Sequence, residues 1–314
     1  MRFIDEHNAR ASCGRRWGVE SICTVLGELG VSIAPSTYYD ARRALDEPSR
    51  SAKRDELLIE EIRRVHADNY GVYGARKVWL ALNREGTAVA RCTVERLMRA
   101  HGLAGVRRGP RMRTTISGDG ARAGDLVGRE FNPPAPDRLW VADFTYVATW
   151  SGMVYVAFVI DAYSRRVLGW RAATSMRTAL VLDALEQAVW TREQQGASDL
   201  ARLVLHSDAG SQYTSIAFTG RLAEAGAAPL VGSVGHAYDN ALAETTIGLF
   251  KTELIKPRAP WRTVEQVEIA TLEWVDWYNH RRLHGACADI PPVDLEEAHY
   301  RQHLPKPEPE HSSP

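Results

Sequence analysis

Long apolar runs, clustered cysteines and an excess of either charge are all missing from this 314-residue sequence. No stretch approaches the roughly 20 apolar residues that a membrane-spanning helix needs. The N-terminal stretch MRFIDEHNAR lacks the apolar core of a signal peptide. The four cysteines, at positions 13, 23, 92 and 287, show no CxxC spacing. This scatter argues against a zinc site and a disulfide framework, and it fits a reducing cytoplasm.

What is present is an ordinary globular composition, with 45% apolar and 25% charged residues, long enough for two or three domains. The net charge of zero conceals an uneven distribution, because residues 1–115 hold 21 Lys and Arg against 14 Asp and Glu. An excess of basic residues in residues 1–115 and of acidic residues in the rest suits a chain that binds a polyanion with one part and metal with the other. Charged faces that only keep the protein soluble explain the same imbalance equally well.

The front third contains two similar segments. Apolar residues at helical spacing before Gly30, and again before Gly86, predict a helix, a turn and a second helix in each segment. A shift of 56 residues superimposes the two segments, with Ile22 on Val78. This is the shape of a helix-turn-helix, whose second helix can enter the major groove, although plain packing modules share it. Nearby arginines favour DNA binding, because such contacts neutralise phosphates. The candidate DNA contacts here are Arg91, Arg96, Arg99, Arg107 and Arg108.

From about residue 138 the pattern changes to strands. Three runs rich in β-branched and aromatic residues, 138–149, 152–162 and 166–174, are separated by turn sequences and predict an antiparallel meander. A helix over 177–195 and a short buried strand ending at Asp208 follow. After them come a helix over 215–226, a strand and a long helix from about Asn240 to Ile255. The predicted fold is therefore α/β, a ribonuclease-H-like mixed sheet with flanking helices, preceded by an all-α helix-turn-helix region.

Three acids fall at notable places in this order. Asp143 lies in the middle of the strand WVADFTYVAT, where an ionised carboxylate without a partner is costly. It is either a solvated residue on an open sheet face or a carboxylate held on rigid backbone to bind a cation. Asp208 ends the fourth strand, which neighbours the first in such a sheet. Glu244 lies about one turn into the last helix, after an N-cap at Asp239 or Asn240. An apolar stripe beside it on the same helix is expected in the core, and it consists of Ala243, Ile247, Phe250 and Leu254.

The sequences around these acids carry a family resemblance. In the order LWVADFTYV, HSDAGSQY, YDNALAETTIGLFKTEL and YNHRRLH, the chain resembles the OrfB-type transposases of bacterial insertion sequences, which have a retroviral-integrase-like DDE core. The resemblance runs from about Trp17 to Pro292. The 35 residues between Asp208 and Glu244 are the family's characteristic spacing. Ala209 departs from the family, which more often has a polar residue there, and the HHCC zinc module of retroviral integrases is absent.

The resemblance implies that Asp143, Asp208 and Glu244 are both the catalytic triad and the metal ligands, holding two Mg²⁺ or Mn²⁺ ions. The implied reaction is attack by water to free a 3′ end, followed by attack of that 3′-hydroxyl on target DNA. Lys251, seven residues after Glu244, shares nearly the same helix face and is expected to hold a phosphate, unless it is simply a solvated lysine. Gln212 is a further candidate for contacting DNA.

The resemblance also implies partners and a location. The partners are the terminal repeats of the insertion sequence and target DNA, with a homo-oligomer on DNA, an upstream-frame protein or fusion, and no membrane. The implied location is the bacterial cytoplasm, in association with the nucleoid. Two alternatives stay open: a metal-dependent nuclease of the same fold without strand transfer, and a non-catalytic DNA-binding regulator.

The predicted organisation is a helix-turn-helix-like segment (1–50), a second helix-turn-helix domain (51–106), a basic linker (107–137), a ribonuclease-H-like integrase core (138–290) and a tail (291–314).

Overall fold

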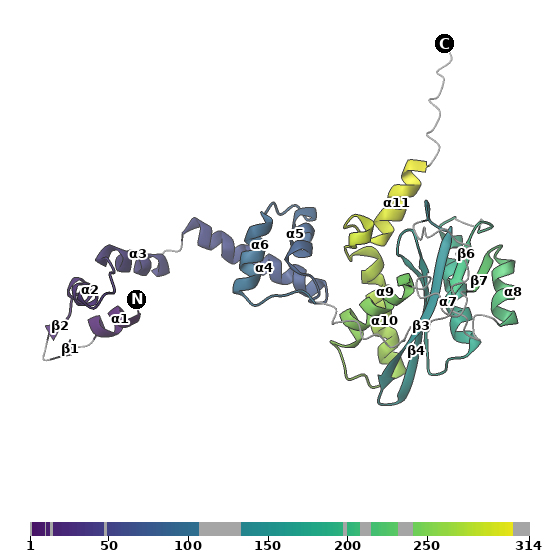
Figure 1. The fold of residues 1–314 in the computed structure, drawn as a ribbon, viewed down its shortest axis with the longest axis horizontal. Helices are drawn as coiled ribbons and strands as arrows, with labels where there is room; N and C mark the ends of the chain where they lie inside the picture. Colours follow the sequence, from purple (N-terminus) through teal and green to yellow (C-terminus); the bar gives the residue numbers. More distant parts are fainter. Residues whose placement is uncertain are drawn as a thin grey trace, which may run out of the picture.

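A computed structural model describes residues 2–9, 11–12, 15–46, 49–106, 133–196, 200–207, 215–231 and 241–303 of the chain. Within these ranges, helical units are followed by a five-stranded sheet with helices packed on both faces (Figure 1). None of the helices described is long and apolar enough to cross a membrane.

The first helical unit has its own small core. Its helices are α1 (Arg2–Ala9), α2 (Val19–Glu28) and α3 (Pro35–Asp46), and the two-residue strands β1 (Ala11–Ser12) and β2 (Arg15–Arg16) pair with each other between α1 and α2. Ile22 of α2 and Tyr38 of α3 are buried together in this core. Gly30 follows α2 with a φ of +85°, a conformation that favours glycine. The helix, turn and helix expected here are confirmed.

The second helical unit repeats the helix, turn and helix of α2 and α3, again with a helix in front of them. It consists of α4 (Arg50–Asp68), α5 (Ala75–Arg84) and α6 (Arg91–Ala100). Val78 is buried like Ile22, and Gly86 has a φ of +90° like Gly30, so the internal repeat extends to the structure. Sequence reasoning did not anticipate α4, which begins where the Ser49 hydroxyl accepts a hydrogen bond from the Ala52 amide at 3.1 Å.

The sheet has the strand order expected from the sequence. Its strands are β3 (Leu139–Thr149), β4 (Gly152–Asp161), β5 (Val167–Ala173), β6 (Val204–Ser207) and β7 (Ala228–Val231). They lie in the order β5-β4-β3-β6-β7. β3, β4 and β5 form the antiparallel meander, and β6 pairs in parallel with both β3 and β7. The first and fourth strands of the sheet are neighbours, and the ribonuclease-H-like fold class is confirmed.

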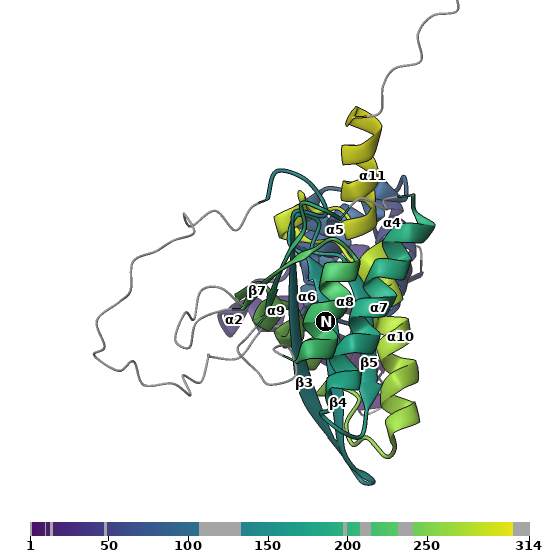
Figure 2. The ribbon, with the colours of Figure 1, turned by 90° about the vertical axis from the view of Figure 1, so that its right-hand side faces the viewer.

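Helices cover both faces of this sheet. On one face α7 (Thr178–Gln194) and α8 (Ile216–Glu224) enclose Trp140 and its neighbours, and Figure 2 shows both helices beside the strands. On the other face α9 (Ala241–Phe250), a π-helical turn η1 (Lys251–Ile255) and α10 (Val264–His280) pack on Val141 and its neighbours. Because side chains alternate along a strand, Asp143 shares the Val141 face, toward α9.

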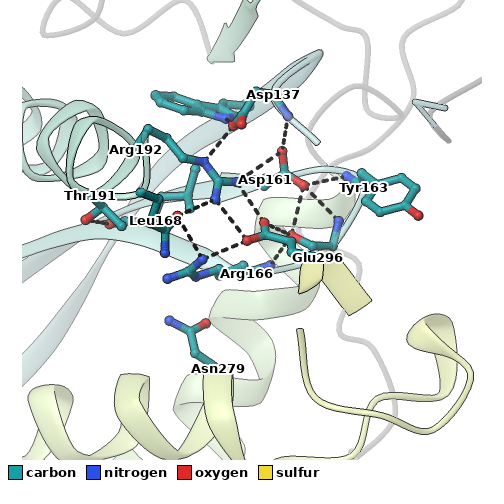
Figure 3. A network of polar contacts seen from close by, with 12 residues as sticks. Asp137, Asp161, Tyr163, Arg166, Leu168, Thr191, Arg192, Asn279 and Glu296 are labelled. Carbon is teal, nitrogen blue, oxygen red and sulfur yellow. Dashed lines mark hydrogen bonds and ion pairs between the residues drawn. The ribbon is translucent and has the colours of Figure 1, made fainter. Parts of the chain in front are cut away.

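A buried polar network attaches the C-terminal helix to the sheet (Figure 3). Residues 292–303 were expected only as part of a tail, and they form α11 (Pro292–His303). Glu296 of α11, which is 2% exposed, accepts hydrogen bonds from Arg166 and Arg192, each at 2.7 Å. Burial, and then the neighbouring Glu296, raises the pKa of Asp161 in this network to about 6. The network joins α11 and α7 to the end of β4.

The second helical unit docks on the C-terminal part of the sheet domain. The Trp277 indole donates to the Asn69 side-chain oxygen at 3.0 Å, and the Leu283 amide donates to the Tyr73 hydroxyl at 2.7 Å. The rings of Tyr70 and Trp277 lie 4.8 Å apart. Apolar side chains of both regions form one continuous core. The orientation of the helical unit relative to the sheet is therefore set by packing and by hydrogen bonds.

Candidate active site

Asp143 lies where β3 loses its neighbour. β6 pairs with β3 only from Leu139 to Ala142, and the next backbone bridge on that edge is between Thr149 and Trp261. Among the strands described, none pairs with this edge in between. One carboxylate oxygen of Asp143 accepts a hydrogen bond from the Phe144 amide at 2.7 Å, which helps to orient the group. Asp143 is thus a partly buried carboxylate beside a stretch of β3 edge that no described strand pairs with.

The end of β6 lies next to this position. Ser207, the last residue of β6, is in register with Ala142, the residue before Asp143. Asp208 is the next residue in the sequence and lies outside the described residues, so its place in the site stays a prediction.

Glu244 comes from α9, which packs on β3. It is exposed in the first turn of the helix, and the residues expected to form the adjoining core stripe are buried. That stripe is Ala243, Ile247, Phe250 and Leu254. No group of three potential metal ligands gathers among the residues described, and these include two of the three predicted acids. The two described acids are carried by elements that pack directly on each other.

Lys251, the first residue of η1, extends toward the same strand. Its ammonium lies 4.9 Å from the centroid of the Tyr146 ring. Burial, followed by the neighbouring Lys256, lowers the pKa of Lys251, whereas the Asp143 carboxylate acts in the opposite direction. The predicted phosphate-binding lysine is therefore half-buried and within electrostatic reach of Asp143. It is not the fully solvated lysine of the alternative interpretation.

Comparison with known proteins identifies the family. Integrase core domain families match residues 133–237 and 225–292, and an HTH-like domain family matches residues 53–111. The chain is 65% identical over 271 residues to a protein of Mycobacterium tuberculosis (strain ATCC 25177 / H37Ra) named "Putative transposase for insertion sequence element IS986/IS6110", which covers 86% of this chain and 97% of that protein. It is 51% identical over 288 residues to the transposase for insertion sequence element IS629 of Shigella sonnei, covering 91% and 93%. The chain belongs to the insertion-sequence transposases.

The predicted family and function are thereby confirmed, and the nuclease and regulator alternatives are not favoured. Among solved structures, the HTLV-2 integrase catalytic core domain in complex with magnesium aligns with a TM-score of 0.40 and 15% identity, covering 52% of this chain and 98% of that one.

The arginines predicted to contact DNA lie on the surface of α6 in the transposase. Arg91, Arg96 and Arg99 are all exposed. Arg91 pairs with Glu95 at 2.7 Å, and Arg96 pairs with Asp55 at 2.8 Å. Exposed pairs of this kind contribute at most about 1 kcal/mol, so a phosphate can displace the carboxylate at little cost. Their contact with DNA stays a prediction. The other predicted contacts, Arg107, Arg108 and Gln212, lie outside the described residues.

The motif YNHRRLH has a structural role in the transposase. Arg282 forms a buried ion pair with Glu253, with Nε 3.0 Å from the carboxylate. Its guanidinium also donates to His284 Nδ1 at 3.1 Å, and His284 Nε2 donates to the Tyr278 carbonyl at 3.2 Å. Burial, and then Arg282, lowers the pKa of His284 well below its ordinary value. The neutral imidazole of His284 therefore helps to position Arg282.

Sequence reasoning missed one cation of this region. Lys77 of α5 lines a cavity of about 550 Å³ together with Arg282, Leu242 of α9 and Val141 of β3. Burial, and then Arg282, lowers the pKa of Lys77 to about 8. No local signal could have revealed this lysine, because its environment is created by residues some two hundred positions later in the chain.

Proposed function

We propose that the transposase cleaves the ends of its insertion sequence and joins the freed 3′-hydroxyl to target DNA, with Asp143, Asp208 and Glu244 as its catalytic acids. The observation that carries the proposal is the meeting of three elements at one place. β6 ends in register with the residue before Asp143, and α9, which bears Glu244, packs on the same strand. Asp208 follows directly after β6 in the sequence.

The donor groups suit a hard divalent cation. Carboxylate oxygens select Mg²⁺ or Mn²⁺, and neither described acid has a cysteine or histidine beside it in sequence. Asp143 is held on rigid strand backbone and oriented by the Phe144 amide, as a ligand should be. Bound metal ions would stabilise the attacking and leaving oxygens of an in-line displacement at phosphorus.

Among the residues that the structure describes, Lys251 is well placed to hold the DNA backbone near Asp143. A half-buried ammonium is poorly hydrated, so an approaching phosphate replaces little bound water and gains a stronger contact. The arginines of α6 would bind phosphates farther along the same DNA. The helical unit and the sheet share one core, so both contacts would act in a fixed relative orientation.

We infer that DNA carrying the terminal repeats and target DNA are the partners, that the transposase acts as a homo-oligomer on DNA, and that an upstream-frame protein or fusion can take part. The division into two helix-turn-helix regions, a basic linker, an integrase core and a tail is proposed with the boundaries given by the sequence.

Conservative substitution of each acid tests the proposal. Asp143→Asn, Asp208→Asn and Glu244→Gln should each reduce cleavage by roughly 100-fold or more, because each removes a charge that acts on the transition state, while DNA affinity stays within about twofold. The assay incubates labelled terminal repeats with plasmid and Mg²⁺, and gels separate cut from joined products. Glu224→Gln, an exposed acid on α8, is the matched control.

Two outcomes would count against the proposal. Full activity in any one of the three variants removes that residue from the triad. Cut products without joined products from the unmodified protein would favour the nuclease alternative.

A further inference from the structure

Two large aromatic side chains project from the β3–β4 hairpin into solvent. Tyr146 is 58% exposed and Trp150 is 70% exposed. Burying such rings is favourable, so aromatic side chains left exposed next to a functional site often mark a surface that a partner covers. Both rings are on the hairpin that begins with the strand of Asp143.

Each ring is accompanied by a cation from the segment that follows Glu244. The Lys251 ammonium is 4.9 Å from the centroid of the Tyr146 ring, and the Arg262 guanidinium carbon is 5.2 Å from that of Trp150. Neither cation forms an ion pair with a carboxylate in the part of the chain that the structure describes. The surface therefore offers flat aromatic faces and positive charge together, a combination that is complementary to nucleic acid.

Lys251 connects this surface to Asp143. Tyr146 is three residues after Asp143, and strand alternation directs their side chains to opposite faces of the sheet. Lys251 nevertheless lies over the Tyr146 ring and is influenced by the charge of Asp143, so its ammonium is close to both residues. A nucleotide whose phosphate lies at the acids would have Tyr146 within reach of its base.

We propose that Tyr146 and Trp150 form a stacking surface for unpaired bases of the DNA strand beside the scissile phosphate. In a paired duplex the base faces are covered by their neighbours, so single-stranded DNA is the form that exposed rings can bind. Each stacked base contributes about 1–3 kcal/mol without sequence selection, and the two cations would hold the adjoining phosphates. The location of the scissile phosphate rests on the proposed function.

Fluorescence of a base analogue measures stacking directly and requires no catalysis. Element-end DNA carries 2-aminopurine in an unpaired flank, and binding is measured without divalent metal. The protein should quench the fluorescence, and Tyr146→Ala should abolish the quenching and weaken binding of this DNA by roughly 5- to 150-fold, the size of one lost stack. Trp150→Ala should reduce the quenching and the affinity by a smaller factor, or should reduce the quenching of a 2-aminopurine placed farther from the scissile phosphate. Affinity for fully paired DNA should not change.

Three further variants separate stacking from other effects. Tyr146→Phe keeps the ring and should behave as the unmodified protein. Trp190→Ala removes a ring of α7 that is 59% exposed and has no cation over it among the described residues, so it should also have no effect. Tyr146→Leu keeps apolar bulk without an aromatic face and should lose the quenching. This last variant keeps the test valid if Tyr146→Ala fails to fold.

Unchanged quenching in Tyr146→Ala and Tyr146→Leu would overturn the inference, as would equal losses on paired and unpaired DNA. Failure of the stacking inference can be distinguished from failure of the proposed function. If only the stacking inference is wrong, the unmodified protein still joins ends in Mg²⁺. If only the proposed function is wrong, quenching still depends on Tyr146 although no end is cut.

Discussion

At the scale of single residues, burial decides which groups of the transposase can exchange protons. The imidazole of His284 is 5% exposed and faces the Arg282 guanidinium, and both features lower its pKa well below the ordinary value. The neutral ring accepts a hydrogen bond from Arg282, which in turn holds Glu253. His284 therefore maintains a buried ion pair and is not available as a proton donor near neutral pH.

The same shift makes His284 a source of acid sensitivity. Its folded pKa lies below the unfolded value of about 6.5, so the unfolded chain binds more protons as the pH falls below that value, and the free energy of unfolding decreases. His284→Gln should remove this contribution and flatten the loss of stability between pH 7 and pH 5, while costing about 1–3 kcal/mol at pH 7.5 through the altered hydrogen bonds. Urea unfolding at several pH values measures both effects.

His280→Gln provides the control for this prediction. His280 is an exposed imidazole on α10, and its replacement should change stability by less than about 0.5 kcal/mol at pH 7.5. An unaltered pH dependence in His284→Gln would show that other groups cause the acid sensitivity.

At the scale of elements, buried ion pairs connect α11 to the sheet domain. Arg192 is fully buried and contacts both Glu296 of α11 and Asp137 before β3, each at 2.7 Å. Arg166 donates to the same Glu296 carboxylate. Two buried guanidinium groups thus share one carboxylate from the C-terminal helix. Removing its charge would leave buried positive charge that Asp137 only partly neutralises.

Glu296→Gln should therefore destabilise the transposase by about 3–5 kcal/mol, although it only replaces one carboxylate oxygen by an amide nitrogen. Chemical denaturation followed by circular dichroism measures the loss. Glu297→Gln, the neighbouring exposed acid on the same helix, should cost less than about 1 kcal/mol because its contact with Arg301 is at the surface. Similar effects of the two substitutions would mean that the network contributes little net stability.

Local pattern explains which elements were predictable. The strands of the meander and the buried stripe of α9 follow from residue types that are close together in sequence, and both were predicted. The sequence pattern suggested one continuous helix as far as Ile255, whereas the structure changes to a π-helical turn at Lys251. α11 was missed as an element because Glu296 finds its partners, Arg166 and Arg192, more than a hundred residues earlier.

At the scale of the whole molecule, the second helical unit and the sheet domain form one packed body (Figure 1). The Asn69–Trp277 and Tyr73–Leu283 hydrogen bonds, together with the ion pair between Arg84 and Asp294 at 2.8 Å, cross the boundary. The sequence indicated two kinds of region but not their contact, because contacts between distant segments have no local signal. DNA bound to α6 would thus meet the acids at a defined angle.

The central claim is that Asp143, Asp208 and Glu244 together hold divalent metal at the phosphate to be cleaved. Anomalous diffraction from crystals of the transposase with element-end DNA and Mn²⁺ measures this most directly. We predict manganese peaks within coordination distance of the carboxylates of all three acids and of oxygens of the scissile phosphate, and loss of those peaks in Asp143→Asn. Manganese bound elsewhere, or three carboxylates too far apart to share the ions in the DNA complex, would contradict it.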